Sequence, residues 1–355
     1  MLEAVEAVGL PVLADLNGER EESIRGFALM NHIIKAGRRQ NMPLCYLYPA
    51  MARPNLTVLT QTHVERLLMQ GTTAQGVELS RAGQRSSIRA SREVIVCQGA
   101  INSPKLLMLS GIGDPAQLKA AGIGSRVAAA DVGRNFQDHI LHGGCIWALP
   151  EPLAPRNSAA EASGFWKSDA SLATPDLNLV QIELPYASEV VAKQYQPPAA
   201  AWALCAGLVA PKSRGQVRLR SANPDDRPIV DANFLGDPAD VKALRRGIEL
   251  CREIGNAAPL SRHVTREVAP GRALAGDALD AFIRDGTTAF FHQVGTCRMG
   301  ADDGAVVDAS LKVKGVDRLR VADGSIMPTI VSCATMASCV LIGERMAEIL
   351  TGKRL

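Results

Sequence analysis

One segment limits the fold of this 355-residue chain more than any other. Residues 93–97 form a short, mostly apolar run that leads into Gly99, and a second apolar segment continues to Gly111. A continuous apolar run of this length is typical of a strand buried on both faces of a parallel sheet. A buried strand, a glycine turn and a helix together form the unit of a doubly wound α/β sheet.

The residues that follow this strand fit a helix with recognisable ends. Ser103 suits the N-cap, Pro104 suits the first helical position, and Gly111 suits the C-terminal stop. The same pattern of buried strand and apolar helix returns late in the chain, over residues 318–322 and 336–350. The sequence therefore predicts an α/β domain that the chain leaves and later re-enters.

The middle of the chain has a different pattern. Strands are predicted over residues 176–182, 203–209 and 216–220, and an amphipathic helix is predicted from Asp237 to Gly255. This combination indicates an antiparallel sheet backed by helices, and so a second domain. The fold class is therefore α/β, or α+β overall.

The domain boundaries follow from this change of pattern. We expect the first domain over residues 1–140 and 291–355, with the second domain inserted over residues 141–290. Residues 1–25 could belong to either domain. Local patterns near the N-terminus predict helices over residues 3–8 and 27–36, a strand over residues 55–60, and a β-meander formed by residues 64–69, 76–79 and 87–90.

Composition argues against several other classes of protein. The net charge of +3 comes from 39 basic and 36 acidic residues without a basic stripe, so nucleic acid is not expected as a partner. The apolar runs are too short for a transmembrane segment, and the N-terminus lacks the features of a signal peptide. Eight scattered cysteines without a Cys-x-x-Cys pair predict a reducing compartment and no metal site. We expect a cytoplasmic protein, with peripheral attachment to the inner membrane as the one membrane association considered.

A set of ordered motifs resembles one known enzyme family. Residues 99–113 (GAINSPKLLMLSGIG) and 132–139 (VGRNFQDH) come first, and residues 211–215 (PKSRG) follow. Residues 291–300 (FHQVGTCRMG) and 319–328 (LRVADGSIMP) complete the set. These segments resemble, in sequence and in order, the glucose–methanol–choline (GMC) flavoprotein oxidoreductases, and the similarity runs through almost the whole chain.

The resemblance implies FAD as the cofactor, a partial FAD-binding domain over residues 1–140 and 291–355, and a substrate-binding domain over residues 141–290. It also implies that His292 is the catalytic base, which removes the hydroxyl proton of an alcohol while hydride leaves for flavin N5. A neutral imidazole suits this role because its pKa lies near working pH. Matching family positions imply cofactor contacts for Val64, Ala100, Asp323, Gly324, Thr335 and Met336.

The sequence departs from the family at the phosphate-binding turn. GMC enzymes begin with a strand, a Gly-x-Gly-x-x-Gly turn and a helix, whose N-terminus favours the charge of the diphosphate. No such unit opens this chain, so we expect it to represent the C-terminal portion of a GMC protein. Residues 111–116 fit G-x-G-x-x-A, but they follow a helix and contain Asp114 and Pro115, so we interpret them as unrelated to phosphate binding.

A second departure concerns the active site itself. The family has a second catalytic residue, His or Asn, after its SxxP turn, and alignment without gaps from Pro328 places Ala334 at that position. A methyl group cannot hydrogen-bond the substrate oxygen, and loss of one positioned donor can cost ~10²–10³ in turnover. Cys333 and Thr335 are at best partial substitutes, because a thiol is a weak donor.

Two hypotheses from different classes follow. The first is an FAD-dependent oxidation of an alcohol to a carbonyl, similar to choline and alcohol dehydrogenases, with His292 as base. Its partners are a small-molecule alcohol and an electron acceptor that the sequence does not identify. The alternative is a non-catalytic remnant, or half of a split protein, that does not bind FAD alone. In both, Asp138 and His139 fit a structural role better than a catalytic one.

Overall fold

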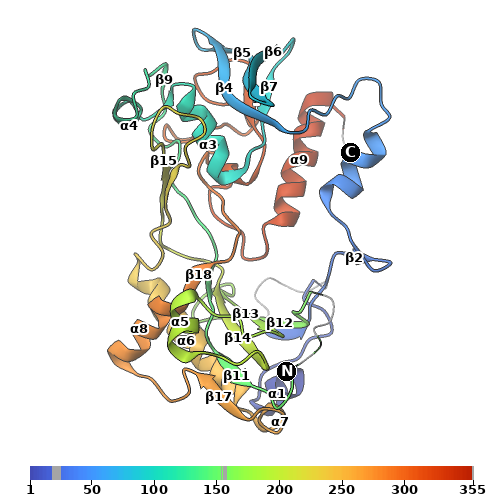
Figure 1. Cartoon of the computed structure of the whole chain (residues 1–355), viewed down its shortest axis with the longest axis vertical. Helices are drawn as coiled ribbons and strands as arrows, with labels where there is room; N and C mark the ends of the chain where they lie inside the picture. The colour runs from blue at the N-terminus through green and yellow to red at the C-terminus, as the bar shows by residue number, and fades with distance from the viewer. Residues whose placement is uncertain (18–24, 153, 155–157, 354–355) are drawn as a thin grey trace.

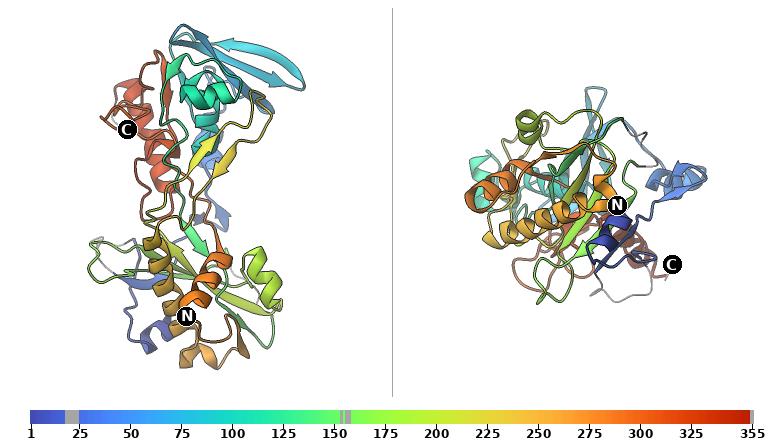
Figure 2. Two further views of the ribbon diagram at one scale, coloured as in Figure 1. Left: turned by 90° about the vertical axis from the view of Figure 1, so that its left-hand side faces the viewer. Right: turned by 90° about the horizontal axis from the view of Figure 1, so that it is seen from below.

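The computed structural model describes residues 1–17, 25–152, 154 and 158–353. The chain forms two lobes along its long axis, with the N-terminus in the lower lobe of Figure 1 and the C-terminal helix in the upper lobe. Figure 2 shows the same two lobes from the side, connected by extended segments. In the described part of the chain, every helix is too short or too polar to cross a membrane.

Within these residues, the lower lobe is built on an antiparallel sheet of eight strands. Its order is β1–β12–β13–β14–β10–β18, and β11 pairs with both β14 and β17 beside this path. The strands are β1 (Gly26–Leu29), β10 (Ile140–His142), β11 (Ile146–Ala148), β12 (Ala162–Trp166), β13 (Leu177–Ile182), β14 (Ala201–Leu208), β17 (Arg266–Ala269) and β18 (Thr287–Ala289). Every pairing is antiparallel, which confirms the sheet type predicted for the middle of the chain.

Helix α6 (Pro238–Gly255) packs on β13 and β14 and buries one face against the sheet. The helix begins where the sequence predicts, because the Asp237 carboxylate accepts the Ala239 N–H at 2.9 Å and Pro238 occupies the first turn. The other helices of this lobe are α1 (Leu2–Ala7), α5 (Glu189–Tyr195), α7 (Ala258–Ser261) and α8 (Gly276–Gly286). Both α1 and β1 lie in this lobe, and the domain boundaries expected at residues 140 and 290 stay predictions.

The core of the lower lobe lies between the sheet and α6. The fully buried Trp147 on β11 stacks on Trp202 of β14, with ring centroids 4.8 Å apart. Gly255 lies against the Trp147 ring, where a Cβ atom would come within 2.1 Å of it. The last residue of α6 therefore has to lack a side chain for the helix to pack against the sheet.

The upper lobe contains the parallel element predicted from residues 93–97. Strand β7 (Val94–Val96) pairs in parallel with β19 (Leu319–Val321), and α3 (Gly99–Leu109) follows β7, which confirms the α/β part of the fold. The predicted meander is also present, as β4 (Thr62–Gln70), β5 (Thr73–Arg81) and β6 (Gln84–Arg89). The remaining elements of this lobe and of its connection to the lower lobe are β2 (Ile34–Lys35), β3 (Arg38–Arg39), η1 (Pro43–Leu47), α2 (Tyr48–Ala50), β8 (Ile112–Gly113), α4 (Pro115–Ala120), β9 (Val127–Ala128), β15 (Gln216–Arg218), β16 (Ile229–Asp231), η2 (Gly324–Ile326) and α9 (Met336–Thr351).

Two predictions near the N-terminus are wrong. The helix expected over residues 27–36 begins as a strand, β1, whose Phe27 packs on Trp166 of β12 with ring centroids 6.4 Å apart. Pairing with a strand far along the chain decides this conformation, and local propensity does not report such pairing. The strand expected over residues 55–60 is an exposed segment that pairs with no strand among the described residues.

The start of α3 also differs from the prediction. The helix begins at Gly99, four residues before Ser103, the expected N-cap. The Asp323 carboxylate accepts the Gly99 N–H at 3.0 Å and so supplies the partner that an N-cap side chain would otherwise provide. A residue at the end of β19 thus sets where α3 begins, which no local pattern could indicate.

Because α3 starts early, Pro104 lies inside the helix rather than at its first position. Proline has no N–H to donate to the Ala100 carbonyl one turn earlier. The Thr296 hydroxyl donates to that carbonyl instead, at 2.5 Å, and Thr296 is fully buried. Because Pro104 leaves the Ala100 carbonyl free, the hydrogen bond from Thr296 can connect α3 to the segment after β18.

The lobes meet along residues 135–139, which run directly into β10. Strand β10 pairs with β18, so the residues before β10 lie beside those after β18. The hydrogen bonding between them continues beyond the ends of the strands, because the Phe290 N–H donates to the His139 carbonyl at 3.1 Å. Gln137 then exchanges two backbone hydrogen bonds with Val294, at 3.1 and 2.9 Å. The lower sheet therefore fixes the position of the segment that follows β18.

Replacing Thr296 by Val tests the hydrogen bond from the Thr296 hydroxyl to the Ala100 carbonyl. The variant keeps the shape of the side chain but leaves the Ala100 carbonyl without its donor, and an unsatisfied buried acceptor costs about 1–3 kcal/mol. Urea unfolding followed by circular dichroism should show that loss for Thr296→Val and a much smaller loss for Thr296→Ser, which keeps the hydroxyl. A stability unchanged in Thr296→Val, or a larger loss in Thr296→Ser than in Thr296→Val, would contradict a role for this hydrogen bond.

Candidate active site

His292 lies just after β18, at the junction of the two lobes. Its backbone N–H donates to Asp138 Oδ1 at 2.8 Å, and its ring Nδ1 lies 2.9 Å from Nδ1 of His139. The Phe290 ring lies beside the imidazole, with centroids 4.9 Å apart. Within the described residues no group hydrogen-bonds to Nε2 of His292. One ring nitrogen is therefore held, and the other is available.

The residue before His292 has an unusual backbone. Phe291 has a φ of 63°, in the left-handed region that few residues other than glycine adopt. Its side chain is also exposed, with 76% of the residue's surface accessible. Strained backbone of this kind clusters at functional sites, and a large exposed apolar side chain beside an imidazole suits a binding surface.

Burial shifts the titration of the groups at this site. It lowers the pKa of His139 to about 4, with the neighbouring His292 adding to the shift and hydrogen bonds to the backbones of Val331 and Val209 opposing it. Burial also lowers the pKa of His292 below its usual 6.5. The pKa of Asp138 rises to about 6, because burial outweighs the hydrogen bonds from His292 and Gln293. At neutral pH the site therefore holds two neutral imidazoles beside one carboxylate.

The segment that carries His139 also holds the loop after η2. Gln137 accepts the Ile330 N–H and donates to the Pro328 carbonyl, both at 3.1 Å. Nε2 of His139 lies 2.8 Å from the Val331 carbonyl oxygen in the same loop. One short segment therefore fixes both loops of the site.

Sequence reasoning missed the contact between His139 and His292. It assigned Asp138 and His139 a structural role, and 153 residues separate the two histidines along the chain. The available signal was the motif VGRNFQDH, which places a carboxylate and an imidazole side by side just before a strand. Only the pairing of β10 with β18 shows that these side chains face His292.

Ala334 lies three residues after Val331 in the loop before α9, and it is exposed. Thr335 is the buried N-cap residue of α9, whereas Met336 is 42% exposed at the start of the helix. The loop of Ala334 is tied to the imidazole pair through Val331, and no described contact joins Ala334 to the pair.

The predicted cofactor residues at the end of β19 lie close to α3. Asp323 accepts the Gly99 N–H at 3.0 Å, next to Ala100 in the first turn of α3. The Gly324 carbonyl accepts the Gly295 N–H at 3.2 Å, three residues after His292. The structure therefore brings Asp323, Gly324, Ala100 and the His292 segment together.

Val64 lies apart from that group, in a hollow of about 350 Å³ between β4 and α3. The lining combines apolar side chains with polar groups near the start of α3, among them His63, Val64, Gln98, Asn102, Lys105 and Leu106.

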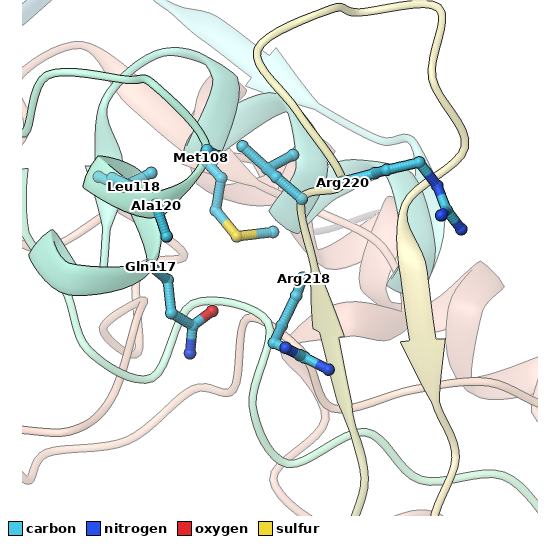
Figure 3. Close-up of a pocket in the computed structure, with 8 residues that line it drawn as sticks. Met108, Gln117, Leu118, Ala120, Arg218 and Arg220 are labelled. Atoms are coloured by element: carbon cyan, nitrogen blue, oxygen red, sulfur yellow. The ribbon is translucent and has the colours of Figure 1, made fainter.

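Another hollow, of about 230 Å³, lies between α4 and β15 and contains none of the predicted site residues. Figure 3 shows the side chains of Gln117 and Arg218 on the same side of this hollow, with Arg220 pointing away. Asp114 caps α4 and accepts the Ala116 N–H at 2.8 Å, so the start of this helix is already occupied. The interpretation that residues 111–116 do not bind phosphate stays a prediction. In the described part of the chain, no group of three or more His, Cys, Asp or Glu side chains could hold a metal ion.

Comparison with known proteins identifies the family of this chain. Residues 1–141 and 211–343 match the N-terminal and C-terminal sequence profiles described as GMC oxidoreductase. Mitochondrial choline dehydrogenase of Mus musculus is 36% identical over 99% of this chain and 62% of its own length. Oxygen-dependent choline dehydrogenase of Brucella anthropi is 35% identical over 99% of this chain and 68% of its own length.

The fold comparison agrees. The crystal structure of pyridoxine 4-oxidase from Mesorbium loti matches with a TM-score of 0.92 and 33% identity, over 100% of this chain and 69% of that chain. The chain spans 62% of the length of the mouse enzyme. The comparisons confirm the family resemblance carried by the sequence motifs. This chain belongs to the GMC oxidoreductase family.

Proposed function

We propose that this chain carries the catalytic base of an FAD-dependent GMC oxidoreductase that oxidises an alcohol to a carbonyl. The observation that supports this most is how His292 is held. Its Nδ1, its backbone N–H and one ring face all have partners, while Nε2 has none among the described residues. A general base needs a fixed direction and a free lone pair on the reacting nitrogen.

In the proposed reaction Nε2 of His292 accepts the hydroxyl proton of the substrate as its carbon loses hydride. FAD, when bound, supplies the acceptor for that hydride. The Asp138 carboxylate holds the backbone of His292 in place, while His139 stays neutral because its pKa is about 4. General-base catalysis of this kind contributes ~10²–10⁴ in rate.

We propose that FAD is held along the line from the Val64 hollow to the junction of α3 and η2. The mixed polarity of the hollow supports an aromatic ring there, and the contacts among Ala100, Asp323 and Gly324 support a second point of approach. Thr335 and Met336 complete the proposed set at the start of α9. Among the described residues no strand leads through a Gly-x-Gly-x-x-Gly turn into a helix, so we assign none to the diphosphate.

The similarity to choline dehydrogenases makes choline the first substrate to test, and pyridoxine, another alcohol, the second. The decisive experiment is to record the visible spectrum of the purified chain with and without added FAD, followed by turnover with an artificial electron acceptor. Bound flavin together with alcohol-dependent reduction of the acceptor is expected. Bound flavin without turnover on any alcohol would contradict the proposal.

One observation favours the alternative, in which the chain binds FAD only after another segment covers it, or not at all. Helix α9 exposes Met336 and Leu341, the latter to 64%, and the segment before β4 exposes Tyr48 and Met51. Exposed apolar side chains in such number are typical of an interaction surface. A folded chain that stays colourless in excess FAD would support this alternative.

The pH dependence of turnover tests His292 directly. Because burial lowers the pKa of His292 below 6.5, the base remains neutral at pH 6.5, and kcat/KM should fall only at lower pH. His292→Asn should lose ~10²–10⁴ in turnover at neutral pH, where wild-type His292 is unprotonated at its reacting nitrogen.

Asp138 provides the control for this profile, because its pKa of about 6 lies in the same range. If His292 causes the acidic fall, the Asp138→Asn variant still shows it. A fall centred above pH 6.5, or full activity of His292→Asn, would contradict the proposed base.

Restoring a hydrogen-bonding side chain at position 334 should raise turnover in the FAD-loaded protein. Asn or His at this position can contact the substrate oxygen, and one positioned donor is worth up to ~10²–10³ in turnover. Thr329→Asn, on the same exposed loop, is the matched control and should change little. No gain, or a loss, with Ala334→Asn and Ala334→His would show that the site does not use position 334.

A further inference from the structure

We propose that His139 is a positioning residue, which places the single proton of neutral His292 on Nδ1 and leaves Nε2 free. The inference rests on the proposed function, because it explains how His292 becomes a base with a defined reacting nitrogen. It goes beyond that function because a backbone carbonyl in another loop, that of Val331, determines which nitrogen of His292 carries the proton.

The first step is the contact between His139 and Val331. Nε2 of His139 lies 2.8 Å from the Val331 carbonyl oxygen. A carbonyl oxygen can only accept a hydrogen bond, so Nε2 of His139 has to carry a proton. The Val331 carbonyl is itself held in place, because Gln137 bonds to the backbone of Pro328 and Ile330 in the same loop.

The second step is the contact between the two imidazoles. Burial keeps His139 neutral, with a pKa of about 4, so its only proton is the one on Nε2 and its Nδ1 is an acceptor. Nδ1 of His292 lies 2.9 Å from that acceptor and has to donate to it. Neutral His292 therefore carries its proton on Nδ1, and its Nε2 holds the lone pair.

The third step is the rigidity of the pair. The two rings are nearly perpendicular, at 83°, with centroids 4.9 Å apart, and only 1% of His139 is exposed. Asp138 also faces His292, but it accepts the backbone N–H and makes no hydrogen bond to the ring in the described structure. Without His139, His292 could carry its proton on either nitrogen, and a proton on Nε2 would prevent it from accepting one from the substrate.

The position of the proton can be measured without substrate or FAD. In the full chain labelled with ¹⁵N-histidine, multiple-bond ¹H–¹⁵N spectra above pH 7 report which ring nitrogen is protonated. The His139 and His292 signals are assigned by their loss in His139→Gln and His292→Asn. We expect the proton on Nδ1 in His292 and on Nε2 in His139. A proton on Nε2 of His292 would overturn the inference.

Two variants of His139 test the cause. His139→Leu fills the space but can neither donate nor accept, and it should shift His292 towards protonation on Nε2. His139→Gln can donate to Val331 and accept from His292 through its amide, so it should keep the proton on Nδ1. An unchanged His292 in His139→Leu would overturn the role of His139. If His139→Leu does not fold, the wild-type and His139→Gln spectra still decide.

Turnover of choline by the FAD-loaded protein separates this inference from the proposed function. His139→Leu should lower kcat by ~10²-fold or more with little change in KM, and His139→Gln should recover most of it. If His292→Asn keeps full turnover, the proposed base is wrong even where the spectra place the proton as expected. If His292→Asn is inactive but His139→Leu is not, the base stands and the positioning role fails.

Discussion

The hydrogen bonds made by residues 135–139 are the interaction on which the candidate site depends. This segment leaves the lower sheet through β10 and bonds to the segment after β18 on one side and to the loop after η2 on the other. The first carries His292 and the second carries Val331 and Ala334. Because the two loops extend from different lobes, the site exists only when both lobes are folded and this segment lies between them.

Burial and hydrogen bonding act against each other at this site, and burial prevails. It keeps both imidazoles neutral and raises the pKa of Asp138 despite two hydrogen bonds to that carboxylate. A neutral resting site suits a base that must accept a proton. A hydrogen bond also connects α3 to the segment that carries His292. Pro104 has no N–H to donate to the Ala100 carbonyl, and the Thr296 hydroxyl donates to it instead.

Elements set by local periodicity could be predicted from the sequence, and elements set by distant pairing could not. Strand β7, helix α6 and the meander follow from apolar runs and caps within a few residues. Strand β1 exists because it pairs with β12, and α3 starts at Gly99 because Asp323 bonds to it. For the same reason the motif around His292 could predict a base, whereas the contact of His292 with His139 required the pairing of β10 with β18.

In the proposed reaction, Nε2 of His292 is the atom that contacts the alcohol. A crystal structure of the FAD-loaded protein with a bound alcohol or an unreactive analogue measures this directly. We expect the substrate oxygen within hydrogen-bond reach of Nε2, at about 2.6–3.2 Å, with Nδ1 still bonded to His139. An oxygen bound to Nδ1, or a substrate seated away from His292, would contradict it.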